Sequence, residues 1–418
     1  MGYIVFLSFV AAIGGILFGY DTAVISGTTE IVKAQFGLST GMEGWFVGCA
    51  LIGSIVGVMV AGMLSDFLGR KKTMLIAALM FSVSAIGCAV CGNFSQLVVY
   101  RMIGGFGIGV VSIVSPVYIS EVAPAEKRGT LVSLYQLFIT IGFLLAYLMN
   151  YLILRGAATD ATGAELGTRM FNQEYWRGMF GCEAIPDLLF LVLIFFIPES
   201  PRWLAIRGQR QDKSEEWKAL REPGILKAVL IGSAIAILGQ FMGVNAVLYY
   251  GPKIFQDAGL SGEGSMFSTV LVGVVNMLTT VIALLIIDKV GRKKLVWWGV
   301  GGMIVCLLCI GTWFAVGTLP TWFLLTFFLL YVFCTAISIS AVVFVLLSEM
   351  YPNRVRGLAM SIAGLALWVG TYLIGEGEPG IEAKLTELGH GTTVTGELRM
   401  KVVRGKDAGK VVVTIVHF

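Results

Sequence analysis

The chain has 418 residues, of which 57% are hydrophobic and only 13% are charged, and its mean hydropathy is +0.85. Soluble domains have about 25% charged residues, so this composition excludes an ordinary soluble protein. The formal net charge of +4 says little by itself, and nothing in the sequence indicates a nucleic-acid partner.

Eleven predominantly apolar stretches predict membrane-spanning helices, because about 20 helical residues cross a bilayer core of roughly 30 Å. Lipid offers no hydrogen-bond partner to the backbone, so these stretches must be helices rather than isolated strands. In chain order they cover residues 4–26, 44–65, 73–92, 97–120, 131–154, 179–197, 225–250, 266–287, 295–316, 321–347 and 357–375. The sequence therefore predicts an all-α polytopic membrane protein.

Basic residues gather in alternate loops between these spans, which the positive-inside rule assigns to the cytoplasm together with the N-terminus. They are Arg70, Lys71, Lys72, Lys127, Arg128, Arg202, Arg207, Arg210, Lys213, Arg292, Lys293, Lys294, Arg354 and Arg356. The opposite loops hold only Lys33, Arg155, Arg169, Arg177 and Lys253. The first apolar run continues into a helical span, so we expect it to be retained rather than cleaved.

Two motifs occur twice in the same order. DFLGRKK at residues 66–72 returns as DKVGRKK at residues 288–294, and SEVAPAEKRG at residues 120–129 returns as SEMYPNRVRG at residues 348–357. The offsets, 288 minus 66 and 348 minus 120, are 222 and 228 residues, which indicates one duplication. We expect a bundle at 1–197, a cytoplasmic linker at 198–224 and a second bundle at 225–375. Two such halves can rock against each other and alternate access to a central site.

The repeated motifs combine an acid, a glycine turn and a basic triplet at a helix end. Such groups can pair with charges and helix dipoles on the neighbouring bundle and hold the cytoplasmic side closed. The candidate latch residues are Asp66, Arg70, Glu121, Arg128, Glu199, Arg202, Asp288, Arg292, Glu349 and Arg356. The alternative is that they are ordinary cytoplasmic anchors.

Signatures of catalysis and of cofactor binding are missing from the sequence. The glycine-rich GGFGIG from Gly104 continues an apolar span and follows no predicted strand, and no GxxxxGK[ST] loop occurs. All seven cysteines lie in apolar segments and both histidines lie in the C-terminal tail, so we expect no metal site and no disulfide. We therefore expect a protein that is not an enzyme and has no cofactor.

Several longer motifs carry a family resemblance. FGYDTAVISG at residues 18–27, YRMIGGFGIG at 100–109, PESPRW at 198–203 and QFMGVNAVLYYGP at 240–252 join the repeated motifs in the expected order. The chain resembles the sugar porter family of the major facilitator superfamily, including bacterial xylose and proton symporters and glucose facilitators. That family has twelve spans and this chain gives eleven, so we expect a major facilitator fold that lacks the last helix.

The segment after Gly375 departs from the family. Residues 376–418 hold six basic and six acidic residues and no apolar span. Leu398, Met400 and Val402 alternate with polar residues, and Val411, Val413 and Ile415 do so again after a turn at residues 405–409. This alternation predicts a polar tail with a β-hairpin.

Asp21 is an acid inside a predicted span, which is costly and by default marks a pathway or a proton relay. The resemblance implies a cationic partner, Arg101, on the fourth helix. Burial favours the protonated carboxyl and a nearby cation favours the ionised one, so a carboxyl between the two can exchange a proton. The alternative is a purely structural pair. Family members that only facilitate diffusion usually carry a neutral residue at this position, so Asp21 favours symport.

A sugar needs amides that donate and accept, and an aromatic face against its ring. The resemblance implies a substrate site made of Gln136, Gln240, Asn245, Asn276, Tyr249, Trp368 and Phe18. The alternative is that lone amides only join helices. Phe143, Ile339 and Leu367 stand where related xylose symporters have polar or tryptophan contacts, and Gly239 replaces a glutamine, so the pocket is expected to be less polar.

Glu183 and Asp187 lie one turn apart in the sixth span, and two interpretations stay open for Asp187, a water-filled cavity or a tolerated buried acid. The resulting hypothesis is a monomeric symporter of a pentose or hexose and protons in the bacterial inner membrane. The alternatives are a passive uniporter, a sugar-binding sensor and an inactive truncated transporter.

Overall fold

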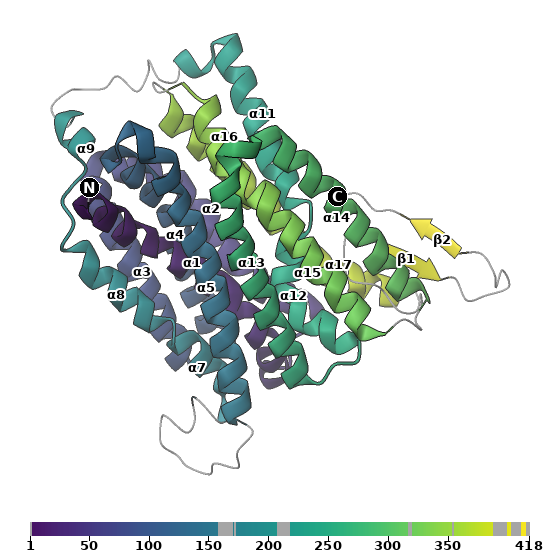
Figure 1. Cartoon of the computed structure of the whole chain (residues 1–418). Helices are drawn as coiled ribbons and strands as arrows, with labels where there is room; N and C mark the ends of the chain where they lie inside the picture. Colours follow the sequence, from purple (N-terminus) through teal and green to yellow (C-terminus); the bar gives the residue numbers. More distant parts are fainter. Residues whose placement is uncertain are drawn as a thin grey trace.

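The computed structural model describes residues 2–157, 170, 173–206, 218–316, 320–352, 355–387, 399–402 and 411–414. Nearly all of them are helical, and the long helices run side by side as one bundle (Figure 1). Nine of the described helices are long and apolar enough to cross a membrane, and Leu358–Leu373 forms a shorter apolar helix. This agrees with the all-α architecture that the composition predicts.

The first half consists of α1 (Gly2–Phe36), α2 (Thr40–Leu68), α3 (Arg70–Val90), α4 (Phe94–Val122), the 3₁₀ turn η1 (Ala125–Lys127), α5 (Arg128–Ala157), α7 (Tyr175–Gly181) and α8 (Ala184–Ile194). The linker contains α9 (Pro201–Ile206). The N-terminus and α9 lie at one end of the molecule and α7 lies at the other (Figure 1).

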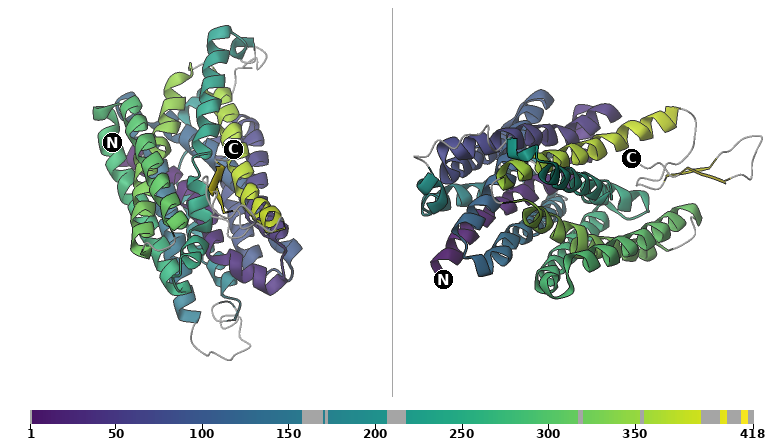
Figure 2. Two further views of the ribbon diagram at one scale, coloured as in Figure 1. Left: turned by 90° about the vertical axis from the view of Figure 1, so that its right-hand side faces the viewer. Right: turned by 90° about the horizontal axis from the view of Figure 1, so that it is seen from above.

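The second half consists of α11 (Pro223–Gln240), α12 (Val244–Asp257), α13 (Gly262–Val290), α14 (Arg292–Val316), α15 (Thr321–Thr335), the π-helical turn η3 (Ala336–Ser340), α16 (Ala341–Met350) and α17 (Arg356–Glu387). Seen from above in Figure 2, α13, α14 and α15 lie on the side away from α2, α3 and α4. We call the end where α2 leads into α3 and α13 leads into α14 the motif end, and the other the opposite end.

Three of the expected spans are interrupted, which corrects the prediction of single continuous helices. The span at 179–197 is divided into α7 and α8, and the span at 321–347 contains the π-helical turn η3. The span at 225–250 breaks at Gly243, whose φ is +84°. Only glycine adopts such a φ without strain, so the chain can turn there before α12 begins.

The two halves repeat the same local geometry at an interval of 222 residues. Gly69 and Gly291, the glycines of the repeated DFLGRKK and DKVGRKK motifs, have φ of +97° and +89°. Ser39 and Ser261 cap α2 and α13, each accepting a hydrogen bond from a backbone N–H three residues on. The matching turns and caps support the duplication predicted from the motifs.

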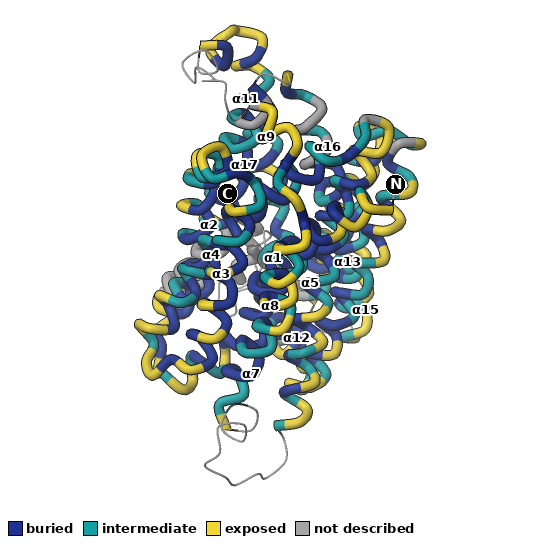
Figure 3. The backbone as a smooth tube through the Cα atoms, turned by 90° about the vertical axis from the view of Figure 1, so that its left-hand side faces the viewer, coloured by how far each residue is buried: buried dark blue, intermediate teal, exposed yellow. Residues whose placement is uncertain are grey.

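Close helix packing depends on glycine at the contacts. At Gly142 on α5, a Cβ atom would overlap the carbonyl oxygen of Ile16 on α1, so only glycine lets the two backbones approach this closely. Buried residues run through the middle of the bundle (Figure 3). The outer helices carry exposed apolar side chains such as Phe67, Trp297 and Trp322. This apolar outer surface is the one that a membrane-spanning bundle presents to lipid.

The C-terminal part differs from the expectation in one respect. α17 continues to Glu387, twelve residues beyond the predicted end of the last helix at 375. Beyond it, β1 (Arg399–Val402) and β2 (Val411–Thr414) pair antiparallel, with Arg399 opposite Thr414. Leu398 and Ile415 lie outside the described residues.

Candidate functional site

A buried pair of opposite charges lies inside the first half. Asp21 on α1 and Arg101 on α4 have 3% and 2% of their side chains exposed, and Asp21 Oδ1 lies 3.6 Å from Arg101 Nη1. The guanidinium carbon also lies 5.5 Å from the ring centroid of Phe46 and 5.3 Å from that of Phe180. The cation is therefore held by one carboxylate and two aromatic faces, an arrangement that stabilises a desolvated charge.

The 3.6 Å separation is longer than a hydrogen bond. Within the described part of the chain, Asp21 Oδ2 and Arg101 Nε have no hydrogen-bond partner. Gly104 on α4 packs closely here, since a Cβ there would lie 2.5 Å from Ser84 Oγ and 3.5 Å from Asp21 Oδ2. The pair is thus held by charge and packing and leaves polar atoms available for a proton or a further contact.

Two more acids lie near this pair. Glu183, between α7 and α8, and Asp187, on α8, have 2% and 0% of their surface exposed. Glu183 is close enough to Asp21, Asp187 and Arg101 to interact with each electrostatically. These four residues, which we call the buried charge cluster, come from α1, α4 and the segment around α8.

The expected sugar-binding amides meet where α11 ends and α12 begins. Gln240 Oε1 accepts hydrogen bonds from Asn245 Nδ2 at 2.6 Å and from Thr371 Oγ1 of α17 at 3.1 Å. The break at Gly243 brings Gln240 and Asn245 together although they lie in different helices. Sequence reasoning missed Thr371, because a threonine in an apolar span carries no distinguishing pattern.

The other expected substrate residues come from both halves. Phe18 on α1 and Trp368 on α17 form an aromatic pair with centroids 5.3 Å apart, which joins the first half to the second. Tyr249 on α12 and Asn276 on α13 are buried, and Gln136 on α5 is half-buried. The apolar side chains expected to reduce the polarity of the pocket, Phe143, Ile339 and Leu367, are buried as well.

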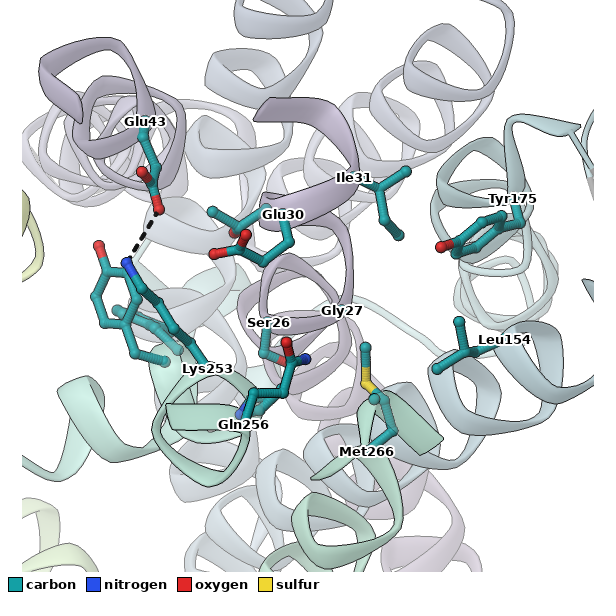
Figure 4. A pocket seen from close by; sticks show the side chains of 15 residues that line it. Ser26, Gly27, Glu30, Ile31, Glu43, Leu154, Tyr175, Lys253, Gln256 and Met266 are labelled. Atoms are coloured by element: carbon teal, nitrogen blue, oxygen red, sulfur yellow. Dashed lines mark ion pairs between the residues drawn. The ribbon is translucent and has the colours of Figure 1, made fainter. Parts of the chain in front are cut away.

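A cavity of about 220 Å³ opens between the halves towards the opposite end (Figure 4). It is lined by the last turns of α1 and α12, the first turns of α2 and α13, and residues of α5 and α7. Of the expected substrate residues, Tyr249 lines this cavity, one helical turn from Asn245. The cavity thus leads towards the amides without containing them.

An ion pair joins the halves beside this cavity (Figure 4). Glu43 in the first turn of α2 lies 2.5 Å from Lys33 Nζ of α1 and 3.8 Å from Lys253 Nζ of α12, and only 1% of its side chain is exposed. A second pair, Arg155 with Glu263 at 3.7 Å, links α5 with α13 but is mostly exposed. The sequence did not predict these contacts. The basic residues at this end are few, so Lys33, Arg155 and Lys253 could have been considered as candidates for ion pairs.

The latch candidates of the first half form a network at the motif end. Arg70 Nε and Nη2 each lie 3.1 Å from an oxygen of Glu121, and Arg70 Nη1 lies 3.4 Å from Asp66 Oδ1. Glu199 accepts the backbone N–H groups of Arg70 and Lys71, at the N-terminus of α3, where a carboxylate is favoured. These contacts join residues of the first half and its linker.

The remaining latch candidates are less informative. Arg128 and Arg202 are exposed, and Arg292 is half-buried. The side chains of Asp288, Glu349 and Arg356 lie outside the described residues. The ion pairs given above that cross between the halves therefore lie at the opposite end, whereas the latch hypothesis expected them at the motif end.

Two helical halves with repeated turns, a buried acid and arginine inside the first half and an aromatic pair between the halves are the arrangement of a membrane transporter with the major facilitator fold. The model of the family described as sugar (and other) transporter matches residues 7–222 and 209–398. The chain belongs to this family, whose members are transporters and not enzymes. The second match reaches residue 398, so the family includes part of the segment that we expected to lie outside it.

Similar proteins include the arabinose-proton symporter of Bacillus subtilis, which is 37% identical over 91% of this chain and 86% of that protein. The D-xylose-proton symporter of Escherichia coli is also 37% identical, over 89% of this chain and 84% of that protein. A solved structure of the E. coli xylose transporter XylE, in a partially occluded inward open conformation, matches with a TM-score of 0.77 at 37% identity. It covers 91% of this chain and 92% of that one.

Replacing Glu43 with glutamine should loosen the contact between the halves at the opposite end. The variant loses the ion pair to Lys33 within the first half and the one to Lys253 across the halves. Losing the pair that crosses changes a two-state equilibrium by about 1 kcal/mol, or roughly a five-fold shift in the ratio of closed to open molecules. Spin labels placed at Gly41 and Gly262, which have no neighbour within reach of a Cβ, would report the distance between α2 and α13. The longer-distance population should grow in Glu43→Gln.

Arg155→Gln is the matched control, because its ion pair is mostly exposed and should change the distances little. Equal shifts in both variants, or none in Glu43→Gln, would contradict the role given to the buried pair.

Proposed function

We propose that this protein is a secondary active transporter that carries a pentose or hexose together with protons by alternating access. The observation that supports it most is the buried pair of Asp21 and Arg101, because a facilitator of passive diffusion has no need of an acid inside a span. The names of the similar proteins, an arabinose-proton symporter and a D-xylose-proton symporter, agree with this proposal.

Proton exchange at Asp21 gives the pair two arrangements. When Asp21 is ionised, it neutralises Arg101 and holds α1 against α4. When Asp21 is protonated, this attraction disappears, while the rings of Phe46 and Phe180 and the nearby Glu183 still interact with Arg101. A change of this kind shifts the equilibrium between two conformations only if protonated and ionised forms favour different ones.

Sugar binding couples the second half to the same conformational equilibrium, because the expected sugar-binding residues come from both halves. Phe18 lies three residues before Asp21 on α1 and contacts Trp368 of α17, whose neighbour Thr371 donates to Gln240. A sugar that contacts these groups would act on the helix that carries the exchanging carboxyl. Linkage then requires that sugar and proton each raise the affinity for the other by the same factor.

The motif end supplies the complementary restraint in this proposal. Arg70, Glu121 and Glu199 tie α3 and α4 to the linker, so that the first half moves as one body. By the positive-inside rule this end faces the cytoplasm, and the bacterial relatives favour the inner membrane. We expect a monomer, since each half supplies its part of the site within one chain.

Asp21→Asn tests the coupling. The amide keeps the size of the side chain but cannot release a proton, so addition of sugar should no longer make the medium of de-energised vesicles alkaline. Accumulation against a sugar gradient should be lost, while exchange of labelled for unlabelled sugar continues. Glu126→Gln, an exposed carboxyl near the motif end, should keep full proton uptake.

Intact sugar-driven proton uptake in Asp21→Asn would remove the assignment. A wild-type protein that equilibrates sugars without ever concentrating them would instead be the passive uniporter.

Gln240→Ala tests the sugar site. The substitution removes the acceptor of two hydrogen bonds, and we expect sugar affinity to fall about ten-fold, corresponding to about 1.4 kcal/mol. Binding of labelled xylose, arabinose and glucose to the purified protein measures it. Thr312→Ala, an exposed side chain that bonds only to the carbonyl of Leu308 in its own helix, is the control. Unchanged affinity for every sugar would place the site elsewhere.

Glu121→Ala tests the network at the motif end. It removes both contacts to the Arg70 guanidinium, which should slow the conformational cycle and lower the maximal transport rate several-fold. Sugar affinity should change little, because the residue is remote from the amides. A wild-type transport rate in this variant would leave Glu121 as an anchor only.

A further inference from the structure

Asp187 is a buried acid that the coupling proposed above does not use. On α8 it lies on the same face as Phe190 and Ile194, at spacings of three and seven residues, and all three are fully buried. The other face carries Ile185, Leu188 and Val192, which are exposed. The helical spacing therefore turns Asp187 into the bundle and the apolar residues outward.

Neither oxygen of Asp187 has a hydrogen-bond partner among the described residues. A buried carboxyl that serves only to hold a fold normally satisfies its oxygens, because an unsatisfied buried polar group costs about 1–3 kcal/mol. In a membrane-spanning segment the cost is not offset by water, so such an acid is by default a functional residue. No hydrogen bond or ion pair given for the described part of the chain supports a purely structural role for Asp187.

The titratable groups that interact with Asp187 are Tyr20 and Asp21 on α1 and Glu183 at the start of α8. Helix α3, which also packs against α8, carries Cys88, and Arg101 of α4 interacts with Asp21 and Glu183. Asp187 interacts electrostatically with Asp21, and Glu183 interacts with both acids. A change of charge on one carboxyl is thus felt by the other two.

The charge balance of the buried charge cluster fixes how many protons its neutral state holds. Arg101 supplies one positive charge, which can balance one carboxylate. Without Asp187, the two acids Asp21 and Glu183 need one proton for neutrality. With Asp187, the three acids need two.

We propose that Asp187 is a second proton-exchanging carboxyl, so that this transporter moves two protons with each sugar. This inference rests on the symport proposed above. Asp187 takes up a proton on the outer side to form the neutral acid, and it returns the same proton to the cytoplasm when Asp21 releases its own. No bond other than O–H forms or breaks, and two positive charges cross the membrane with each cycle.

The number of protons per sugar sets how steeply a membrane potential concentrates the sugar. One charge moved through 100 mV corresponds to about 2.3 kcal/mol, which multiplies the attainable concentration ratio by roughly 50. In proteoliposomes with imposed potassium-diffusion potentials and no pH gradient, the opposing sugar gradient that stops net flux is measured at several voltages. The slope of its logarithm against voltage gives the proton number.

The wild-type protein should give a slope of two protons, and Asp187→Asn and Asp187→Ala should each give a slope of one. At 100 mV the stopping gradient of the variants should therefore be about 50-fold smaller. Because neither oxygen has a hydrogen-bond partner among the described residues, Asp187→Ala should not lower the thermal stability of the purified protein. Glu126→Gln, exposed and remote from the cluster, should keep the slope of two.

A wild-type slope of one overturns this inference and leaves the symport intact, whereas a wild-type slope of zero overturns both. A slope of two that persists in the Asp187 variants assigns the second proton to another group and also overturns it. The wild-type slope decides the proton number even where a variant fails to fold.

Discussion

The structure depends on the cost of placing charge in a bundle that lipid surrounds. A carboxylate or a guanidinium alone in such a place would cost several kcal/mol, and the pair of Asp21 and Arg101 reduces this cost only while both remain charged and close. The aromatic faces of Phe46 and Phe180 keep Arg101 in place when the carboxylate is neutral. The symport proposed above requires the first half to stay folded in either protonation state of Asp21.

The charged contacts are distributed unequally between the two ends of the molecule. At the motif end, Arg70, Glu121 and Glu199 bind α3 and α4 to the linker within the first half. At the opposite end, Glu43 and Lys253 connect one half with the other. The contacts at the motif end stiffen the first half, and the contact at the opposite end opposes separation of the two halves. A transporter whose halves rock about a central site needs both kinds of contact.

The sequence predicted what depends on composition and on local pattern. Apolar length located the spans, and the duplicated motifs predicted the repeat that the turns at Gly69 and Gly291 display. The family resemblance paired Asp21 with Arg101 on a different helix, which no spacing within either helix could reveal. The ion pair of Glu43 and Lys253 was not predicted, because it joins α2 to α12 and depends on how the two halves pack against each other. The interruptions at Gly243 and at η3 were not predicted, because the mean hydropathy of a span does not change where its helix is locally broken.

The break at Gly243 has a mechanical consequence. α12 is only fourteen residues long and is joined to α11 by a residue whose backbone no other amino acid adopts readily, so it can swing as a short lever. Asn245 sits near the pivot of this lever, and Tyr249 and Lys253 follow at one-turn intervals along its arm. A small displacement at Asn245 would produce a larger displacement at the end of α12, where Lys253 contacts Glu43 of the first half.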